Sequence, residues 1–145
     1  VGRMLKQIPL QRIAYNAIPS VVYTNPEIAC IGLTEKDLNE IKEGDFAPSM
    51  STDEPFVPYE VHKLPMTYSG RFVAENEGET GLCKVIVDKR SKTIMGVHMI
   101  GNPCSEFVAA ASFAVRMGYT VGEFKQVVFP HPTVGEVLRE VIAEL

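Results

Sequence analysis

The sequence predicts an α+β domain, in which an antiparallel sheet of about four to five strands carries packed helices. The clearest evidence is a hairpin formed by residues 81–88 and 93–100, whose strands are apolar at odd and even positions alike. Such strands need cover on both faces of the sheet. Two apolar helical segments, residues 103–117 and the end of the chain from Thr133, can supply it.

Length and charge limit the possibilities. The chain has 145 residues, 46% of them apolar, and a net charge of −4, which fits one compact domain. Lys and Arg are scattered among the acids, so nucleic acid is not an expected partner. No apolar run approaches 18 residues and no signal-peptide pattern is present, so we expect a cytoplasmic chain with no membrane partner. The opening, Val1 rather than Met, suggests a piece of a longer protein.

The first third of the chain predicts strands, a turn and a short helix. Residues 1–19 have no clear period and are expected to join a preceding region, whereas the domain itself is expected over residues 20–145. Thr34 and Asp37 resemble a capping box at the start of a helix. The predicted elements are a strand at 21–24, a turn at 25–27, a strand at 28–33 and a helix from 34 to about 41.

The middle of the chain predicts a long exposed loop and then an edge strand. Residues 42–58 are rich in proline, glycine and acids and cannot bury much surface. Tyr59–Met66 can return as a strand, which Pro65 confines to an edge or ends. His62 is expected on the solvent side of that strand. We expect residues 69–74 to continue in extended form and 75–81 to make a polar turn.

The hairpin leads into a long apolar helix. Asn102 is the expected N-cap, Pro103 the first residue and Gly118 the end. The interior of this helix, residues 107–115, carries almost no polar side chain, and a domain of this size can rarely surround such a helix. We therefore expect one of its faces to meet a partner chain. Thr120 and Glu123 predict a further capped helix.

Cysteines and histidines give no metal-binding pattern. Cys30, Cys83 and Cys104 form no close pair, and an odd count in this setting predicts free thiols. Cys30 and Cys83 read as small core residues. Cys104 falls in the first turn of a helix, where the dipole is expected to lower its thiol pKa. His98, in mid-strand, is expected to be a satisfied buried or interfacial histidine.

The segment from Phe129 to Glu136 is the strongest candidate site. His131 lies between two prolines, which leaves its backbone little freedom. Thr133 and Glu136 make a capping box whose carboxylate lies near His131, and apolar residues at helical spacing follow. The pattern predicts a fixed histidine beside a carboxylate on an anchored helix. A short motif is only a hypothesis, and an ordinary turn histidine is the alternative.

Three segments carry a resemblance to a known family: residues 17–27 (Ala-Ile-Pro-Ser-Val-Val-Tyr-Thr-Asn-Pro-Glu), 31–35 (Ile-Gly-Leu-Thr-Glu) and 131–136 (His-Pro-Thr-Val-Gly-Glu). They resemble the C-terminal dimerisation (interface) domain of the pyridine nucleotide–disulfide oxidoreductases, and within that family the dihydrolipoamide dehydrogenases. The resemblance implies the fold of that FAD/NAD-linked reductase domain, with residues 1–19 as the tail of the preceding FAD/NAD region.

The resemblance also implies roles and partners. His131 would be the acid–base catalyst and Glu136 its orienting carboxylate, both lent to the other subunit of a homodimer. FAD and NAD would be bound by domains outside this sequence, which has no GxGxxG and no close cysteine pair. The implied partners are lipoyl-bearing proteins of 2-oxoacid dehydrogenase or glycine cleavage complexes. The isolated domain is expected to bind no cofactor and to be inactive.

Three alternatives stay open at this point. Glutathione reductase-like enzymes share the interface fold and the His-Pro-Thr-x-x-Glu ending. The chain could also be a stand-alone, non-catalytic dimerisation module. Finally, Cys104, His131 and Glu136 could serve as nucleophile, base and orienting group of a small cysteine enzyme.

Overall fold

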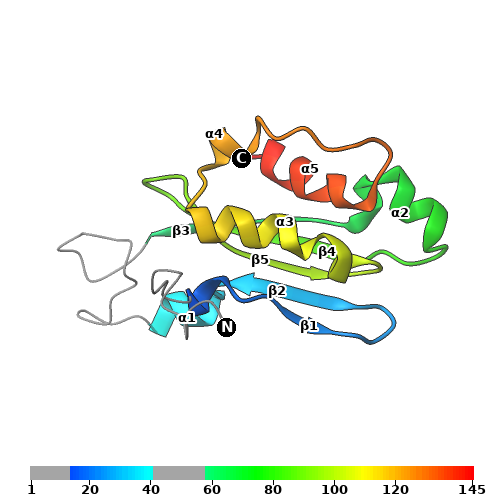
Figure 1. Ribbon diagram of the computed structural model, residues 1–145, viewed down its shortest axis with the longest axis horizontal. Coiled ribbons are helices and arrows are strands. Elements are labelled where there is room, and N and C mark those ends of the chain that lie inside the picture. The colour runs from blue at the N-terminus through cyan, green and yellow to red at the C-terminus, as the bar shows by residue number, and fades with distance from the viewer. Residues whose placement is uncertain (1–13, 41–57) are drawn as a thin grey trace, which may run out of the picture.

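The computed structural model describes residues 14–40 and 58–145. Five strands form one antiparallel sheet in the order β1-β2-β5-β4-β3, which confirms the predicted fold class (Figure 1). The strands are β1 (Ser20–Val22), β2 (Ile28–Gly32), β3 (Tyr59–Leu64), β4 (Leu82–Asp88) and β5 (Ile94–Ile100). The helices are α1 (Glu35–Glu40), α2 (Gly70–Glu75), α3 (Cys104–Met117), α4 (Val121–Phe124) and α5 (Val137–Ala143), with 3₁₀ turns η1 (Tyr15–Ala17), η2 (Met66–Tyr68) and η3 (Val134–Glu136).

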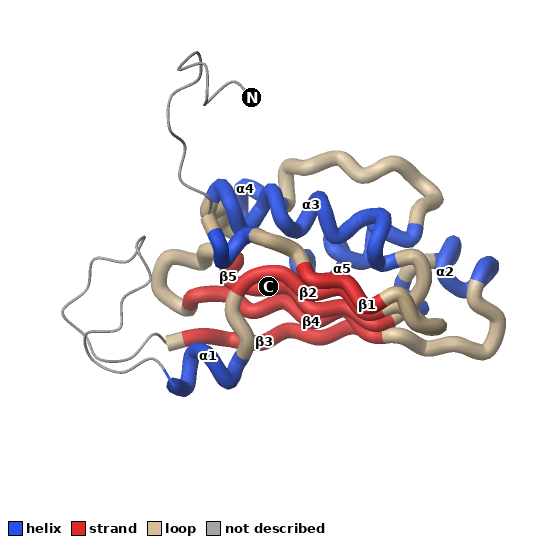
Figure 2. The backbone as a smooth tube through the Cα atoms, turned by 60° about the horizontal axis from the view of Figure 1, so that its bottom comes forward, coloured by secondary structure: helices blue, strands red, loops and turns tan. Residues whose placement is uncertain are grey.

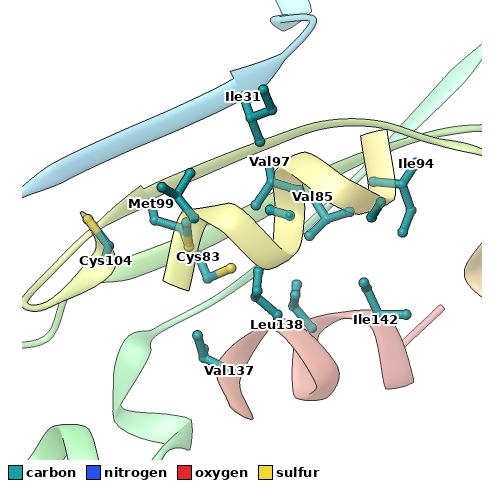
Figure 3. Close-up of a cluster of buried hydrophobic side chains, with 14 of the residues drawn as sticks. Ile31, Cys83, Val85, Ile94, Val97, Met99, Cys104, Val137, Leu138 and Ile142 are labelled. Atoms are coloured by element: carbon teal, nitrogen blue, oxygen red, sulfur yellow. The ribbon is translucent and has the colours of Figure 1, made fainter. Parts of the chain in front are cut away.

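The helices cover the two faces of the sheet unequally. Figure 2 shows α2, α3, α4 and α5 on one side of the strands and α1 on the other. The main core lies between the sheet and the larger helical layer, where Figure 3 shows Leu138 and Ile142 of α5 reaching toward the strand residue Val85. Leu38 of α1 packs against Ile86 on the opposite face. Cover on both sides is what strands with apolar residues at every position require.

The hairpin β4–β5 and the edge strand β3 agree with the sequence. Among the described strands, β3 pairs only with β4. Pro65 follows β3 directly, so the proline lies outside the hydrogen-bonded ladder. Strand β1 begins one residue earlier than expected, at Ser20, and ends two residues earlier, at Val22. We expected His62 on the solvent side of its strand, and the structure corrects this. His62 pairs with Val85, which belongs to the main core, so His62 lies on the face covered by the larger helical layer and is half-buried.

Helix α2 was not predicted: residues 69–74 were expected to be extended. Ser69 is its N-cap, and the Ser69 hydroxyl accepts a hydrogen bond from the Phe72 N–H at 3.2 Å. Phe72 is fully buried and fixes the short helix against the core. A cap and one buried anchor thus outweigh the weak local preference of a six-residue segment.

The start of α3 also differs from the prediction. Asn102 does not cap the helix, because its Oδ1 accepts the Glu27 N–H at 2.9 Å and its amide donates to Asn25. Glu27 takes over the capping task, accepting the Ser105 N–H at 3.0 Å on its carboxylate. The Asn-Pro-Glu turn after β1 is therefore bound to the N-terminus of α3.

The rest of α3 matches the expectation of a helix only partly covered by its own domain. It ends at Gly118, whose φ of +67° is the left-handed C-cap conformation. Val108, Ala111 and Ala114 are buried, whereas Phe113 and Met117 are 69% and 63% exposed. Large apolar side chains therefore remain on the outer face of this helix.

The predicted 42–58 loop and most of the 1–19 lead-in lie outside the described residues. Of the lead-in, η1 packs against α3 and β2. The capping boxes predicted at Thr34–Asp37 and Thr120–Glu123 are both present. Among the helices of the described residues, none is long and apolar enough to cross a membrane.

Candidate active site

The loop that carries His131 is fixed just before the histidine. The ring of Phe129 packs against Phe124 of α4, with centroids 5.8 Å apart. The Thr133 hydroxyl donates to the Pro130 carbonyl at 2.8 Å and closes a small turn around His131. The histidine backbone is thus held from both sides, as the flanking prolines predict.

The segment after His131 enters the core through a tight turn. Turn η3 leads into α5, so the α-helix begins at Val137, three residues later than a cap at Thr133 alone would place it. The Thr133 N–H donates to Glu136 Oε2 at 2.8 Å, which is the carboxylate half of the predicted capping box. Four residues then anchor the helix in the core: Val137, Leu138, Val141 and Ile142.

His131 and Glu136 are in direct contact, as the spacing predicts. Nδ1 of His131 lies 2.8 Å from Glu136 Oε1, so each carboxylate oxygen has its own partner. The two side chains differ sharply in exposure, 82% for His131 and 12% for Glu136. The Glu136 carboxylate is therefore largely buried in the domain, whereas the His131 imidazole is exposed on its surface.

The surroundings of Glu136 favour its ionised form. The hydrogen bond from the Thr133 N–H is the largest cause that lowers the pKa of the Glu136 carboxyl, and the bond to His131 adds to it, against an opposing effect of burial. An ionised carboxylate on Nδ1 orients the ring and stabilises the imidazolium. Within the described residues Nε2 has no hydrogen-bond partner, so this nitrogen is available to take up or release a proton.

Cys104 does not form a second reactive centre. Its side chain is fully buried, and burial, followed by the charge of Glu27, raises the pKa of the Cys104 thiol to about 11. This corrects the expectation that the helix dipole lowers it, because desolvation disfavours a thiolate more strongly than one helix end favours it. A fully buried thiol with a raised pKa is protonated near neutral pH and has no access to a substrate, which argues against the small cysteine enzyme.

The other predicted residues lie elsewhere. Cys83 is buried in the core, where burial raises its pKa to about 12, and Cys30 is half-buried. His98 lies on the α1 side of the sheet with Nε2 3.0 Å from the Leu33 carbonyl oxygen, a satisfied histidine as predicted. None of these residues contributes to the His131–Glu136 pair.

Sequence reasoning missed one residue that contacts the site loop. The Ser69 hydroxyl donates to the Thr133 carbonyl at 2.9 Å, across 64 positions in the sequence. A sequence pattern over a few neighbouring residues cannot predict a contact over this separation. The only signal available was a serine before a glycine and a helix-forming stretch, which is a possible cap.

Comparison with known proteins gives consistent matches. A family model described as the pyridine nucleotide-disulphide oxidoreductase dimerisation domain matches residues 18–142. Mitochondrial dihydrolipoyl dehydrogenase from Caenorhabditis elegans is 37% identical over 88% of this chain and 23% of its own length. The human mitochondrial enzyme is 32% identical over 88% of the chain and 22% of its length. The chain thus spans about a quarter of the length of these relatives.

Solved structures agree on the fold. A crystal structure of LpdA from Mycobacterium tuberculosis matches with a TM-score of 0.78 at 20% identity, over 99% of this chain and 28% of that one. A Cu(II) complex of a HOCl-induced flavoprotein disulfide reductase from Escherichia coli matches with a TM-score of 0.72 at 19% identity, over 90% and 26%. The five-stranded sheet, the helical layer above it and the family model lead to one conclusion: this chain belongs to the pyridine nucleotide–disulphide oxidoreductase family and comprises its dimerisation domain.

Proposed function

We propose that this chain is the dimerisation domain of a dihydrolipoamide dehydrogenase and supplies His131 and Glu136 to the active site of the partner subunit. In that role His131 is the acid–base catalyst and Glu136 its orienting carboxylate. The observation that carries the proposal is the combination of a fixed Nδ1 with a side chain that is 82% exposed. A histidine held in place but facing outward suits chemistry on a group outside its own domain.

The proposed reaction is dithiol–disulfide exchange. An ordinary thiol has a pKa of about 8.5 and is mostly protonated at neutral pH, whereas the thiolate is the attacking species. Nε2 of His131 would accept the proton as a substrate sulfur attacks the enzyme disulfide. That attack forms a mixed disulfide and releases one enzyme sulfur as a thiolate. The second substrate thiol then attacks the substrate sulfur of the mixed disulfide, which closes the substrate disulfide and releases the other enzyme sulfur. The substrate dithiol is thereby oxidised and the enzyme disulfide reduced by two electrons; of the two protons, one stays on the imidazole and the other passes to an enzyme thiolate. Ionised Glu136 stabilises that imidazolium.

The remaining parts of the reaction belong to other regions of the complete enzyme. FAD and NAD, the cofactors of the family, would be bound there and would carry the electrons onward. We propose that the domain by itself binds neither cofactor and is inactive. The lipoyl-bearing proteins of 2-oxoacid dehydrogenase or glycine cleavage complexes are the proposed partners, through the dithiol that His131 would serve.

The test replaces His131 by Gln in the complete enzyme. Loss of one general base is expected to slow flavin reduction by dihydrolipoamide by roughly 10²–10⁴-fold, while folding and flavin content stay near the original. The matched control is His62→Gln, a histidine outside the pair, which should leave the rate unchanged. An unchanged rate in the His131 variant would remove the proposed role.

Two alternatives can be distinguished from this proposal. A glutathione reductase-like enzyme would reduce oxidised glutathione faster than it oxidises dihydrolipoamide, and would do so through the same histidine. Assaying both substrates with both variants separates these two enzymes. A stand-alone dimerisation module would be indicated instead by the gene, in which a start codon would directly precede the codon for Val1.

A further inference from the structure

The polar groups of Thr133 are all engaged, although this residue is not part of the proposed pair. Its N–H donates to Glu136 and its hydroxyl to the Pro130 carbonyl. Both bonds lie inside the site segment, residues 129–136, and fix its internal shape only. The carbonyl of Thr133 accepts the Glu136 N–H at 3.4 Å inside the segment, and it also accepts the Ser69 hydroxyl, which belongs to a different element. The bond from Ser69 fixes the segment relative to the rest of the domain.

Ser69 is well built for such a task. It is only 2% exposed, and its hydroxyl has two neighbours: it accepts the Phe72 N–H at 3.2 Å and donates to the Thr133 carbonyl oxygen at 2.9 Å. The accepted bond caps α2, whose Phe72 is fully buried. The hydrogen bond from Phe72 therefore fixes the Ser69 oxygen on a helix anchored in the core, and the Ser69 hydroxyl proton is donated to the site segment. Helix α2 and turn η3 pack together at this point.

We infer that Ser69 is a positioning residue for the His131–Glu136 pair, holding Thr133 where its N–H meets the Glu136 carboxylate. The inference rests on the proposed function only for its effect on turnover, since the geometry stands without it. The Phe124–Phe129 ring contact and the packing of η3 against α3 also hold the segment, but apolar contacts are non-directional. The Ser69 hydrogen bond is directional, and it ties the Thr133 carbonyl to α2, an element outside the segment.

The first test measures Glu136 in the 145-residue chain by NMR titration of its side-chain carboxyl carbon. Because the Thr133 N–H is the largest cause that lowers the pKa of Glu136, loosening Thr133 should raise that pKa toward the ordinary carboxyl value. We expect this in Ser69→Ala and in Ser69→Gly, a variant that keeps most of the N-cap preference. Ser69→Thr keeps the hydroxyl and should restore the original value.

The control is Thr34→Ala, which removes a cap on the opposite side of the sheet, where the Thr34 hydroxyl accepts the Asp37 N–H. It should lower stability about as much as Ser69→Ala does, but leave the Glu136 titration unchanged. If the Ser69 variants lose stability and the Glu136 titration stays where it was, Ser69 is only a helix cap and the inference is wrong.

The second test uses the complete reductase. Ser69→Ala should lower kcat about tenfold with little change in KM, because a misplacement of about 1 Å in a catalytic group can cost up to about a hundredfold. The pH–rate profile should shift with it, and Ser69→Thr should recover both. If the NMR result holds but neither Ser69→Ala nor His131→Gln affects turnover, Ser69 still positions the pair and it is the proposed function that fails.

Discussion

At the scale of single residues, Glu136 has two separable tasks. One carboxylate oxygen accepts from the Thr133 N–H and closes the start of the C-terminal helix, and the other contacts His131. The first task needs only an acceptor, which either Glu or Gln can provide in a capping box. The second task, stabilising an imidazolium, needs a negative charge. Structure and chemistry therefore make different demands on the same side chain.

Two substitutions of Glu136 should separate these tasks. Glu136→Gln keeps the cap and loses the charge, so turnover of the complete enzyme should fall while stability changes little. Glu136→Ala loses both and should also lower the unfolding free energy by about 0.5–2 kcal/mol, the usual worth of a cap. Stopped-flow kinetics and urea denaturation measure the two effects. Equal losses of stability in both variants would contradict the division.

The pair was predictable from sequence because all its determinants are local. His131, Thr133 and Glu136 lie within six residues, and proline and capping rules act over that distance. Ser69 was not predictable, since its contact depends on how α2 packs. The pKa of Cys104 was predicted in the wrong direction because the helix end is visible in the sequence and the burial is not.

At the scale of elements, α1 is attached to the sheet partly through His98. The imidazole Nε2 lies 3.0 Å from the Leu33 carbonyl oxygen, just before α1. His98 pairs with Lys84 on strand β4 and with Cys30 on strand β2. Glu35, which forms an ion pair with Lys84, and Asp37 approach from α1. Burial is the largest cause that lowers the pKa of His98, followed by an opposing effect of the Leu33 bond.

This environment predicts a pH dependence of stability. Because the pKa of His98 is lower in the folded chain than its ordinary value of 6.5, the unfolded chain binds the proton first. The contribution of His98 should be complete above about pH 6.5 and be lost as the pH falls toward the folded pKa. His98→Gln cannot titrate, so its unfolding free energy, measured by urea denaturation, should fall less over this range. Identical pH profiles would contradict the prediction.

Elements differed in how far the sequence determined them. The β4–β5 hairpin was predictable because both strands are apolar and continuous and the turn between them is polar. Helix α2 was missed because six residues carry no clear period, and its existence depends on the Ser69 cap and on burial of Phe72. At α3, Asn102 looked like a cap because the competing turn around Glu27 is 75 residues away.

At the scale of the whole molecule, the outer face of α3 is left uncovered by residues 14–40 and 58–145. Phe113 and Met117 lie there with most of their side chains exposed. Apolar helix faces of this kind mark interaction surfaces. In a dimerisation domain, a second copy of the chain related by two-fold symmetry is the occupant that we propose.

Phe113→Asp should therefore weaken the dimer. A carboxylate in an apolar interface has no partner, and we expect the dimer dissociation constant to rise at least about tenfold. Tyr23→Asp is the matched control, since Tyr23 is also an exposed aromatic residue but lies in the turn after β1. Sedimentation velocity across a concentration series measures the effect. If both variants and the original chain have the same dimer dissociation constant, the interface does not include the outer face of α3.

The central claim is that His131 acts on the active site of the partner subunit. The direct test mixes two inactive forms of the complete enzyme, one carrying His131→Gln and one lacking the redox cysteines of the preceding region. Mixed dimers isolated through two different affinity tags should regain about half of the original turnover, because each contains one intact composite site. If mixed dimers shown to have formed remain as inactive as either parent, His131 does not act across the dimer and the claim is wrong.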